Sequence, residues 1–288
     1  MRIIPNSEFI VNPDGSVFHL HIRPEQLSDK IVMMGDPDRV TLTASFFDSI
    51  ECDVRSREFH TVTGMYKGKR LTALSHGIGT DNIDIVVTEL DALANIDFHT
   101  RTVKPEFRQL TMIRVGTSGG MQPHCPIGSY VVSEKSIGFD GLLHYYAHSQ
   151  DVREEDFEEA FQKQVNWSPY HCSPYVVSAD EELVERIGHD MIRGVTISAI
   201  GFYGPQGRHV RLALADPELN AKIESFRYGH YSITNYEMES SAIAGLGKMM
   251  GHKCMTVCAI IANRVALESN ADYKGSIEDL IKVVLERI

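Results

Sequence analysis

Apolar residues follow two alternating spacings along this chain, and each spacing predicts one kind of element. Mostly apolar runs with the length of buried strands occur at 31–34, 71–75, 110–114, 126–132, 194–200 and 254–262. Apolar residues three or four positions apart predict helices that begin near Pro37, Asp81, Ser178, Asn235 and Ser276. Strands that alternate with helices are typical of an α/β fold with functional sites at the strand ends. We see no linker or repeat, so residues 17–288 are predicted to form a single domain after an N-terminal arm of residues 1–16.

The chain carries a strong negative charge, which narrows the kinds of partner it can bind. Its 288 residues include 28 Lys and Arg against 39 Asp and Glu, a formal net charge of −11 at pH 7. This balance argues against nucleic-acid and anionic-membrane partners. An anionic substrate would therefore need a locally basic pocket. No apolar run reaches membrane-spanning length.

Five cysteines are scattered along the sequence in a pattern that favours free thiols. Cys254 and Cys258 share one predicted strand, so they lie roughly 13 Å apart, which is too far for a disulfide or a shared metal. Reduced cysteines and the lack of a leader-like N-terminus predict a cytoplasmic protein. The segment 145–173 contains an acidic helix with Phe157 and Phe161 one turn apart, and its role is open between a surface insertion and a subunit contact.

The segment 110–120 has the composition of an oxyanion site. An apolar strand ends at Arg114, and the glycine-rich residues 116–120 predict a loop. Together they offer a guanidinium, two hydroxyls (one of them from Thr117) and several backbone N–H groups, which suit a phosphate. A strand followed by an ordinary glycine turn explains this segment equally well when it is taken alone.

Residues 35–39 indicate a second anion site after another apolar strand. Gly35 permits a close backbone approach, Asp36 is a good N-cap, and Pro37 suits the first position of a helix. Arg39 lies in the first helical turn, where its charge opposes the helix dipole. An arginine in that position indicates contact with an anion rather than stabilisation of the helix.

Residues 202–208 combine groups that recognise a flat heterocycle. Gln206 offers a donor and an acceptor on one amide, Arg208 adds a planar fork, and Phe202 offers a face for stacking. Such a set suits a ring with carbonyls on either side of an N–H. The dinucleotide fingerprint is excluded at residues 77–82, because Asn82 stands in place of its third glycine.

Other polar residues are ambiguous when they are considered singly. Glu237 and Glu239 flank Met238, a pattern that suits hydroxyl recognition above an apolar floor but also an ordinary acidic helix N-terminus. His19 alternates with apolar neighbours, which favours a histidine on the edge of a strand. Arg57 belongs to a charged run of the kind that usually faces solvent.

Five motifs occur in a fixed order along the chain, at 35–39, 57–59, 114–120, 202–208 and 235–240. As a set they resemble the motifs of the uridine phosphorylases, a branch of nucleoside phosphorylase family I. The resemblance runs from about Val17 to the C-terminus. It implies a mixed central β-sheet that forms a distorted barrel flanked by helices in one catalytic domain. It also implies a pentosyltransferase that catalyses the reversible phosphorolysis of uridine to uracil and ribose 1-phosphate, in pyrimidine salvage or catabolism.

The same resemblance assigns a role to each candidate residue. It implies that phosphate is held by Gly35, Arg39, Arg114 and Thr117, and by Arg57 of a neighbouring subunit. It implies that ribose is held by Glu239, Met238 and Thr117, and by His19 of that neighbour. It implies that uracil is read by Gln206 and Arg208 and stacked on Phe202. The catalytic residues would be Arg208, Gln206, Arg114 and Glu239, in sites shared between the two subunits of a homodimer.

Three positions bear on specificity, cofactors and assembly. Ala262 stands where purine-cleaving relatives carry an aspartate that protonates the base, which favours uridine as the substrate. Residues 79–82 differ from the loop that binds potassium in bacterial hexamers together with the glutamate that matches Glu58. A potassium site at Glu58 and a hexamer therefore stay open. Inorganic phosphate is a co-substrate, and the resemblance implies no other cofactor or metal.

Alternatives remain at the level of the reaction. A related phosphorylase would accept a broader range of pyrimidines or purines, a nucleosidase would use water in place of phosphate, and a nucleoside-binding protein would catalyse nothing. The three phosphate arginines argue against the last two. Activity on thymidine or deoxyuridine stays open, because a single hydroxyl contact decides it.

Overall fold

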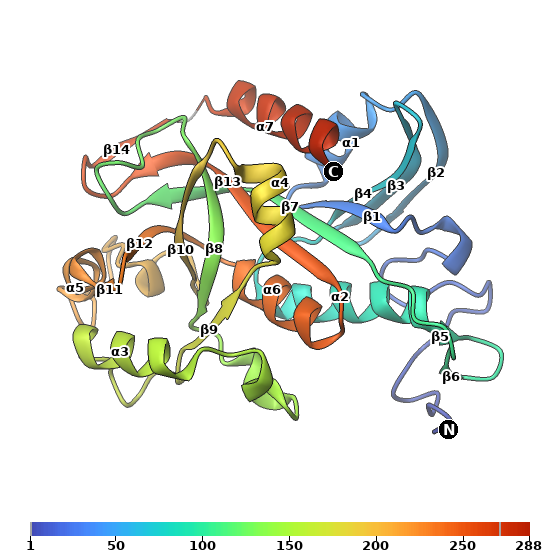
Figure 1. Ribbon diagram of the computed structural model, residues 1–288, viewed down its shortest axis with the longest axis horizontal. Coiled ribbons are helices and arrows are strands. Elements are labelled where there is room, and N and C mark those ends of the chain that lie inside the picture. The colour runs from blue at the N-terminus through green and yellow to red at the C-terminus, as the bar shows by residue number, and fades with distance from the viewer. Residues whose placement is uncertain (1, 271) are drawn as a thin grey trace.

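Strands from all along the chain form one mixed sheet, and helices pack on both sides of it (Figure 1). The computed structural model describes residues 2–270 and 272–288. The strands of this sheet are β1 (Lys30–Met34), β2 (Ser49–Ser56), β3 (Phe59–Tyr66), β4 (Lys69–Ser75), β7 (Thr111–Gly120), β8 (Tyr130–Gly138), β9 (Tyr175–Ser178), β10 (Ile192–Ser198), β11 (Arg227–Tyr228), β12 (Tyr231–Glu237), β13 (Lys253–Asn263) and β14 (Glu268–Ser269). A separate hairpin of β5 (Ile96–Asp97) and β6 (Thr102–Val103) lies near the N-terminus.

The α-helices fall largely where the apolar spacing predicts them. They are α1 (Pro37–Ala44), α2 (Thr80–Asn95), α3 (Glu155–Val165), α4 (Glu181–Gly188), α5 (Leu219–Ser225), α6 (Ser240–Met249) and α7 (Lys274–Arg287). The start of α1 is as predicted, since Asp36 accepts the backbone N–H of Asp38 at 2.9 Å. In α3, Phe157 and Phe161 are fully buried in a cluster with Phe226, so this helix belongs to the core.

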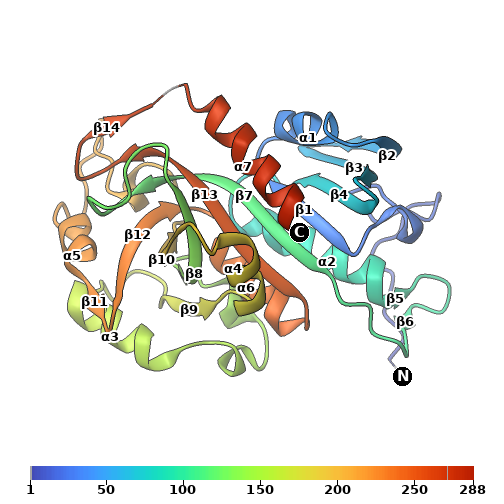
Figure 2. The ribbon, with the colours of Figure 1, turned by 45° about the horizontal axis from the view of Figure 1, so that its top comes forward.

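Part of the sheet closes on itself into a barrel. β7 pairs with β13, β13 with β8, β8 with β10, and β10 with β12. β12 then returns to the end of β7 through the pairs Asn235–Gly120 and Tyr236–Gly119. The first part of β7 uses that same edge to pair with β1, which leads on to β4, β3 and β2 (Figure 2). The predicted mixed sheet with a distorted barrel is thereby confirmed.

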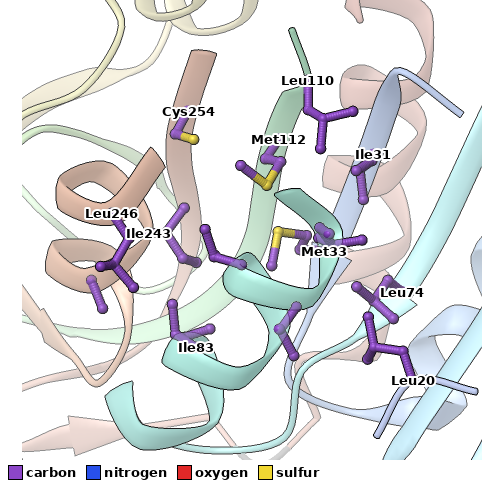
Figure 3. Close-up of a cluster of buried hydrophobic side chains, with 14 of the residues drawn as sticks. Leu20, Ile31, Met33, Leu74, Ile83, Leu110, Met112, Ile243, Leu246 and Cys254 are labelled. Atoms are coloured by element: carbon purple, nitrogen blue, oxygen red, sulfur yellow. The ribbon is translucent and has the colours of Figure 1, made fainter. Parts of the chain in front are cut away.

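A large group of buried apolar side chains lies between the parallel strands and helices α2 and α6. Figure 3 shows Met33 of β1 and Met112 of β7 facing Ile83 of α2 and Ile243 of α6. All four side chains are fully buried. The apolar stripe predicted for the helix after Asp81 is the face that packs here. This core holds β1, β7 and the two helices together, and so it also positions the polar residues at their ends.

Two predictions near the barrel closure are wrong. Residues 116–120 form no loop, because their backbone pairs with β13 and β12 and continues β7. Residues 235–237 begin no helix, because they complete β12, and α6 begins at Ser240.

Two further local predictions are also wrong. Residues 17–20 form a turn rather than a strand edge, with one bridge between Val17 and Val11. Ser178 lies in β9, and α4 is capped instead by Asp180, whose carboxylate accepts the backbone N–H of Leu183 at 3.0 Å.

Candidate functional site

Three separate segments meet at one edge of the sheet because their strands are parallel neighbours. β1 pairs in parallel with both β4 and β7, so Gly35, His76 and Arg114 come to the same carboxyl edge. A Cβ atom placed on Gly35 would lie 3.1 Å from the carbonyl oxygen of Gly77 and 3.8 Å from Cε1 of His76. In α/β sheets, this edge is where ligands bind.

Arg114 is the charged centre of this edge. Its buried side chain lies along β7 over Gly116, so that a Cβ atom on Gly116 would lie only 2.4 Å from Nη1 of Arg114. Nη1 lies 3.0 Å from a carboxylate oxygen of Glu237, and Nη2 forms an ion pair with Glu239. Burial acts to lower the pKa of Arg114, but the charges of Glu239 and Glu237 outweigh it and raise that pKa. The guanidinium therefore stays charged.

The two carboxylates beside the guanidinium have different tasks. Glu237 accepts hydrogen bonds from the hydroxyl of Ser198 at 2.7 Å and from the backbone N–H of Ser240 at 2.9 Å, so it caps α6. Glu239 accepts one backbone N–H, from Gly79 at 2.7 Å. Burial raises the pKa of Glu239 against the opposing guanidinium charge. Glu239 keeps capacity for a ligand hydroxyl, whereas Glu237 is used within the protein.

Two more of the predicted phosphate residues have donors to spare. Arg39 is half-buried in the first turn of α1, with its guanidinium carbon 5.8 Å from the centroid of Tyr273. Over residues 2–270 and 272–288 it forms no ion pair, and the hydroxyl of Thr117 forms no hydrogen bond. Arg39 is also near enough to His76 for its charge to lower the pKa of that histidine. These donors, with Gly35 and Arg114, make the edge suitable for an anion.

The predicted base-recognition residues follow β10 and contact one another. Arg208 donates to Oε1 of Gln206 at 2.6 Å, and its guanidinium carbon lies 3.6 Å from the centroid of Phe202. Burial and the charge of Arg264 lower the pKa of Arg208 to about 10. One face of Phe202 is thus covered by the guanidinium. A base that stacks on Phe202 must displace that group or use the opposite face.

A mostly apolar cavity of about 810 Å³ adjoins this loop. Arg208 lies on its wall together with Trp167, Tyr203 and Leu212. Trp167 belongs to the segment 145–173, which therefore helps to enclose the space beside the base-recognition residues.

His19 and Arg57 form a group of their own. Nδ1 of His19 lies 2.6 Å from Oε1 of Glu89, which also accepts the backbone N–H of His19 at 3.0 Å. The guanidinium carbon of Arg57 lies 5.7 Å from the centroid of Phe18. In the described part of the chain, no hydrogen bond or ion pair joins either residue to Arg114. The contacts of His19 and Arg57 within one chain are therefore with Glu89 and Phe18.

Glu58, where the sequence leaves a potassium site open, lies next to the turn after β4. A Cβ atom on Gly77 would lie 3.2 Å from Cγ of Glu58 and 2.4 Å from Nδ2 of Asn82. Among the described residues, no three His, Cys, Asp or Glu side chains gather in a way that could hold a metal ion. The helices in that same part of the chain include none that is long and apolar enough to cross a membrane.

The sequence pattern does not single out three residues that shape the site. Nε2 of His76 accepts the Nε–H of Arg114 at 3.2 Å. Arg264 donates to the backbone carbonyl of Gln206 at 3.1 Å and so supports the base-recognition residues. Glu89 lies on the buried face of α2. An acidic residue on an otherwise apolar face is the signal that could have revealed it.

Comparison with known proteins assigns the class. Residues 29–287 match the family model described as the Phosphorylase superfamily, and the chain belongs to this family. Uridine phosphorylase of Escherichia coli is 28% identical over 281 residues, covering 94% of this chain and 96% of that protein. Uridine phosphorylase of Thermococcus kodakarensis is 28% identical over 261 residues, covering 88% of this chain and 80% of that protein.

A solved structure agrees with these sequence relatives. The crystal structure of a Trypanosoma brucei nucleoside phosphorylase, which is described as showing uridine phosphorylase activity, has a TM-score of 0.88 and 27% sequence identity. It matches 97% of this chain and 98% of that one. The resemblance to uridine phosphorylases predicted from the five motifs is thus confirmed over nearly the whole chain.

Proposed function

We propose that this chain catalyses the reversible phosphorolysis of uridine, which yields uracil and ribose 1-phosphate. The observation that carries the proposal is the buried pair of Arg114 and Glu239 at the carboxyl edge of the sheet, next to Gly35. The curated uridine phosphorylases that match most of the chain support this choice of reaction. Such an activity would belong to the salvage or catabolism of pyrimidine nucleosides.

Phosphate is assigned to the space beside Gly35, where the anion donors converge. Arg39 and Thr117 offer hydrogen-bond donors that the described residues leave free, and Arg114 supplies the buried positive charge. Glu239 accepts a ribose hydroxyl and orients the sugar, with the half-buried Met238 beneath it. In this arrangement the phosphate faces the anomeric carbon as nucleophile, so much of the barrier is removed by positioning.

The base leaves as an anion, and its recognition residues stabilise that charge. As the glycosidic bond stretches, the sugar gains oxocarbenium character and negative charge gathers on the uracil carbonyls. Arg208, whose pKa of about 10 keeps it charged at neutral pH, and Gln206 donate to those carbonyls. This contribution is electrostatic stabilisation by pre-positioned donors and needs no proton transfer to the ring.

His19 and Arg57 are assigned to the site of a neighbouring copy in a homodimer. The support for this assignment is the resemblance to enzymes whose sites are shared between subunits. A potassium ion at Glu58 would likewise need oxygen ligands from the neighbouring copy, because a single carboxylate is too few.

The reaction is tested by following the ultraviolet absorbance of uridine with purified protein, with and without phosphate. Inosine and thymidine are measured in parallel. We expect uridine to be cleaved only when phosphate is present, and inosine not to be cleaved. Cleavage without phosphate would instead identify a nucleosidase, and cleavage of inosine would overturn the argument from Ala262. Failure to cleave any of the three nucleosides would refute the proposal in favour of a binding protein.

Sharing of the site is tested by mixing two inactive variants, His19→Ala and Arg208→Ala. In a mixed dimer of two shared sites, one site carries both substitutions and the other carries neither. Co-expression should therefore restore about a quarter of the wild-type activity if the dimers form at random. Absence of recovery, with mixed dimers shown by a tag on one variant, would contradict shared sites.

A further inference from the structure

His76 lies beside a buried positive charge, which is an unfavourable place for a basic side chain. It follows β4, has no exposed surface, and its Nε2 lies 3.2 Å from Nε of Arg114. Because an arginine Nε–H can only donate, Nε2 is the acceptor, and the proton of the neutral ring is on Nδ1. Burial, followed by the charge of Arg114 and then that of Arg39, lowers the pKa of His76 well below its ordinary value. The imidazole is therefore neutral.

The second ring nitrogen of His76, Nδ1, has no hydrogen-bond partner among the described residues. Across residues 2–270 and 272–288, Nδ1 is buried and makes no hydrogen bond. A buried histidine with a structural role normally uses both nitrogens. His252 is such a case, since its Nδ1 accepts the backbone N–H of Leu110 at 3.2 Å and its Nε2 lies 3.1 Å from Asp91. Among the described residues, the side-chain partner of the His76 ring is Arg114.

The hydrogen bond between His76 and Arg114 fixes the guanidinium of Arg114 at its third nitrogen. The guanidinium of Arg114 is held at Nε by His76, at Nη1 by Glu237 at 3.0 Å, and at Nη2 by Glu239. The negative charge of the two carboxylates already exceeds the single positive charge of the guanidinium. A third carboxylate at the position of His76 would orient the guanidinium equally well, but it would repel phosphate. A neutral imidazole orients the group without adding negative charge.

We propose that His76 is a positioning residue for phosphate, which acts by aiming the guanidinium of Arg114 into the space beside Gly35. The imidazole reaches the boundary of that space, since a Cβ atom on Gly35 would lie 3.8 Å from Cε1 of His76. This inference rests on the proposed phosphorolysis. It predicts that changes at His76 alter phosphate binding more than recognition of the base.

The test compares His76→Leu with His76→Gln, in which the amide oxygen can replace Nε2 as the acceptor. Loss of one hydrogen bond to a charged group should raise the KM for phosphate roughly ten- to a hundredfold in the leucine variant. The glutamine variant should stay within a few-fold of the wild type. The ratio of uridine to thymidine cleavage should not change in either variant. Calorimetric titration with phosphate gives a Kd that does not depend on turnover.

His252→Leu is the matched control, because it also removes a buried histidine but at the N-terminal end of β7. It should lower the Tm and leave the KM for phosphate unchanged. If His76→Leu does not fold, His76→Asn, whose shorter amide cannot reach Arg114, takes its place. A folded leucine or asparagine variant with wild-type phosphate binding, or a folded glutamine variant without rescue, would overturn the inference. If the wild type binds phosphate but does not cleave uridine, the proposed function fails while the calorimetric comparison still decides the role of His76.

Discussion

Gly116→Ala tests whether catalysis depends on the observed position of the Arg114 guanidinium. The two residues lie two positions apart on one face of β7. The added methyl carbon would lie 2.4 Å from Nη1 and 2.8 Å from Cζ of Arg114, whereas ordinary contact begins at 3.4 Å. The guanidinium must therefore retreat by about 1 Å.

This retreat is costly because the guanidinium is buried and anchored. An exposed arginine would swing aside freely, but here Nη1 lies 3.0 Å from Glu237 and Nε is 3.2 Å from its acceptor on His76. Misplacement of a binding group by about 1 Å lowers kcat/KM by about a hundredfold. That factor corresponds to about 2.7 kcal/mol of lost transition-state stabilisation. The free energy of unfolding should fall by about 1.5–3 kcal/mol, the worth of one hydrogen bond to a charged group.

The assay measures initial rates of phosphate-dependent uridine cleavage at limiting and saturating phosphate, together with the Tm. Gly119→Ala is the matched control on the same strand. Its nearest new contact would be Nε of Arg264 at 3.6 Å, an ordinary distance, so we expect activity within a few-fold of the wild type. A folded Gly116→Ala variant with wild-type kcat/KM would refute the reasoning.

Three further predictions concern other parts of the molecule. Arg208→Ala should lower kcat/KM for uridine by about a hundredfold or more, because it removes the cation that stabilises the departing base; an unchanged value in steady-state kinetics would exclude that role. Glu89→Gln should raise the KM for uridine by roughly tenfold and spare that for phosphate, because the carboxylate orients His19; equal KM values for uridine would limit Glu89 to a structural role. Asp190 accepts a hydrogen bond from Arg287 at 2.6 Å, which lowers the pKa of Asp190 to about 2. A carboxyl pKa that is depressed in the folded state stabilises the protein above the ordinary value near 4, and this contribution is lost as the pH falls towards 2. Asp190→Asn should therefore lower stability at pH 7 by less than about 1 kcal/mol, since the pair is exposed, and a difference in Tm that persists at the lowest pH where the protein is folded would contradict this account.

The sequence predicts those parts of the fold that depend on local patterns. The apolar stripe after Asp81 becomes the core face of α2, and Asp36 caps α1 as its position indicates. The run 254–262 becomes the buried strand β13. In each case the residues that determine the element lie within the element or directly beside it.

Predictions fail where distant pairing overrides local composition. The glycines at 116–120 suit a loop, but the neighbouring strands β13 and β12 supply backbone partners that only the closed barrel brings close. Glu237 was predicted within a helix, whereas it caps α6 from the end of a strand. Local windows of the sequence show neither outcome, because residues 116–120 pair with strands more than a hundred positions away and Glu237 pairs with Ser198, 39 positions earlier.

For the site, too, the sequence predicts some features and misses those that depend on contacts between distant residues. The resemblance predicts that Arg114 and Glu239 bind phosphate and ribose in one site, and the structure joins the two side chains in an ion pair. The sequence could not show that Glu237 is used within the protein, or that His76 takes the Nε–H of Arg114. Those details depend on side-chain geometry, which no spacing rule describes.

The closure of the barrel makes activity a measure of complete folding. Arg114 comes from β7, and Glu239 follows β12, 125 positions later in the chain. The two residues meet only after β12 has paired with the end of β7 at Asn235 and Gly120. Contacts so distant in sequence are the slow ones to form. During refolding, uridine cleavage should therefore appear only with the last structural signal, and a chain with its sheet formed but its barrel open should be inert rather than weakly active.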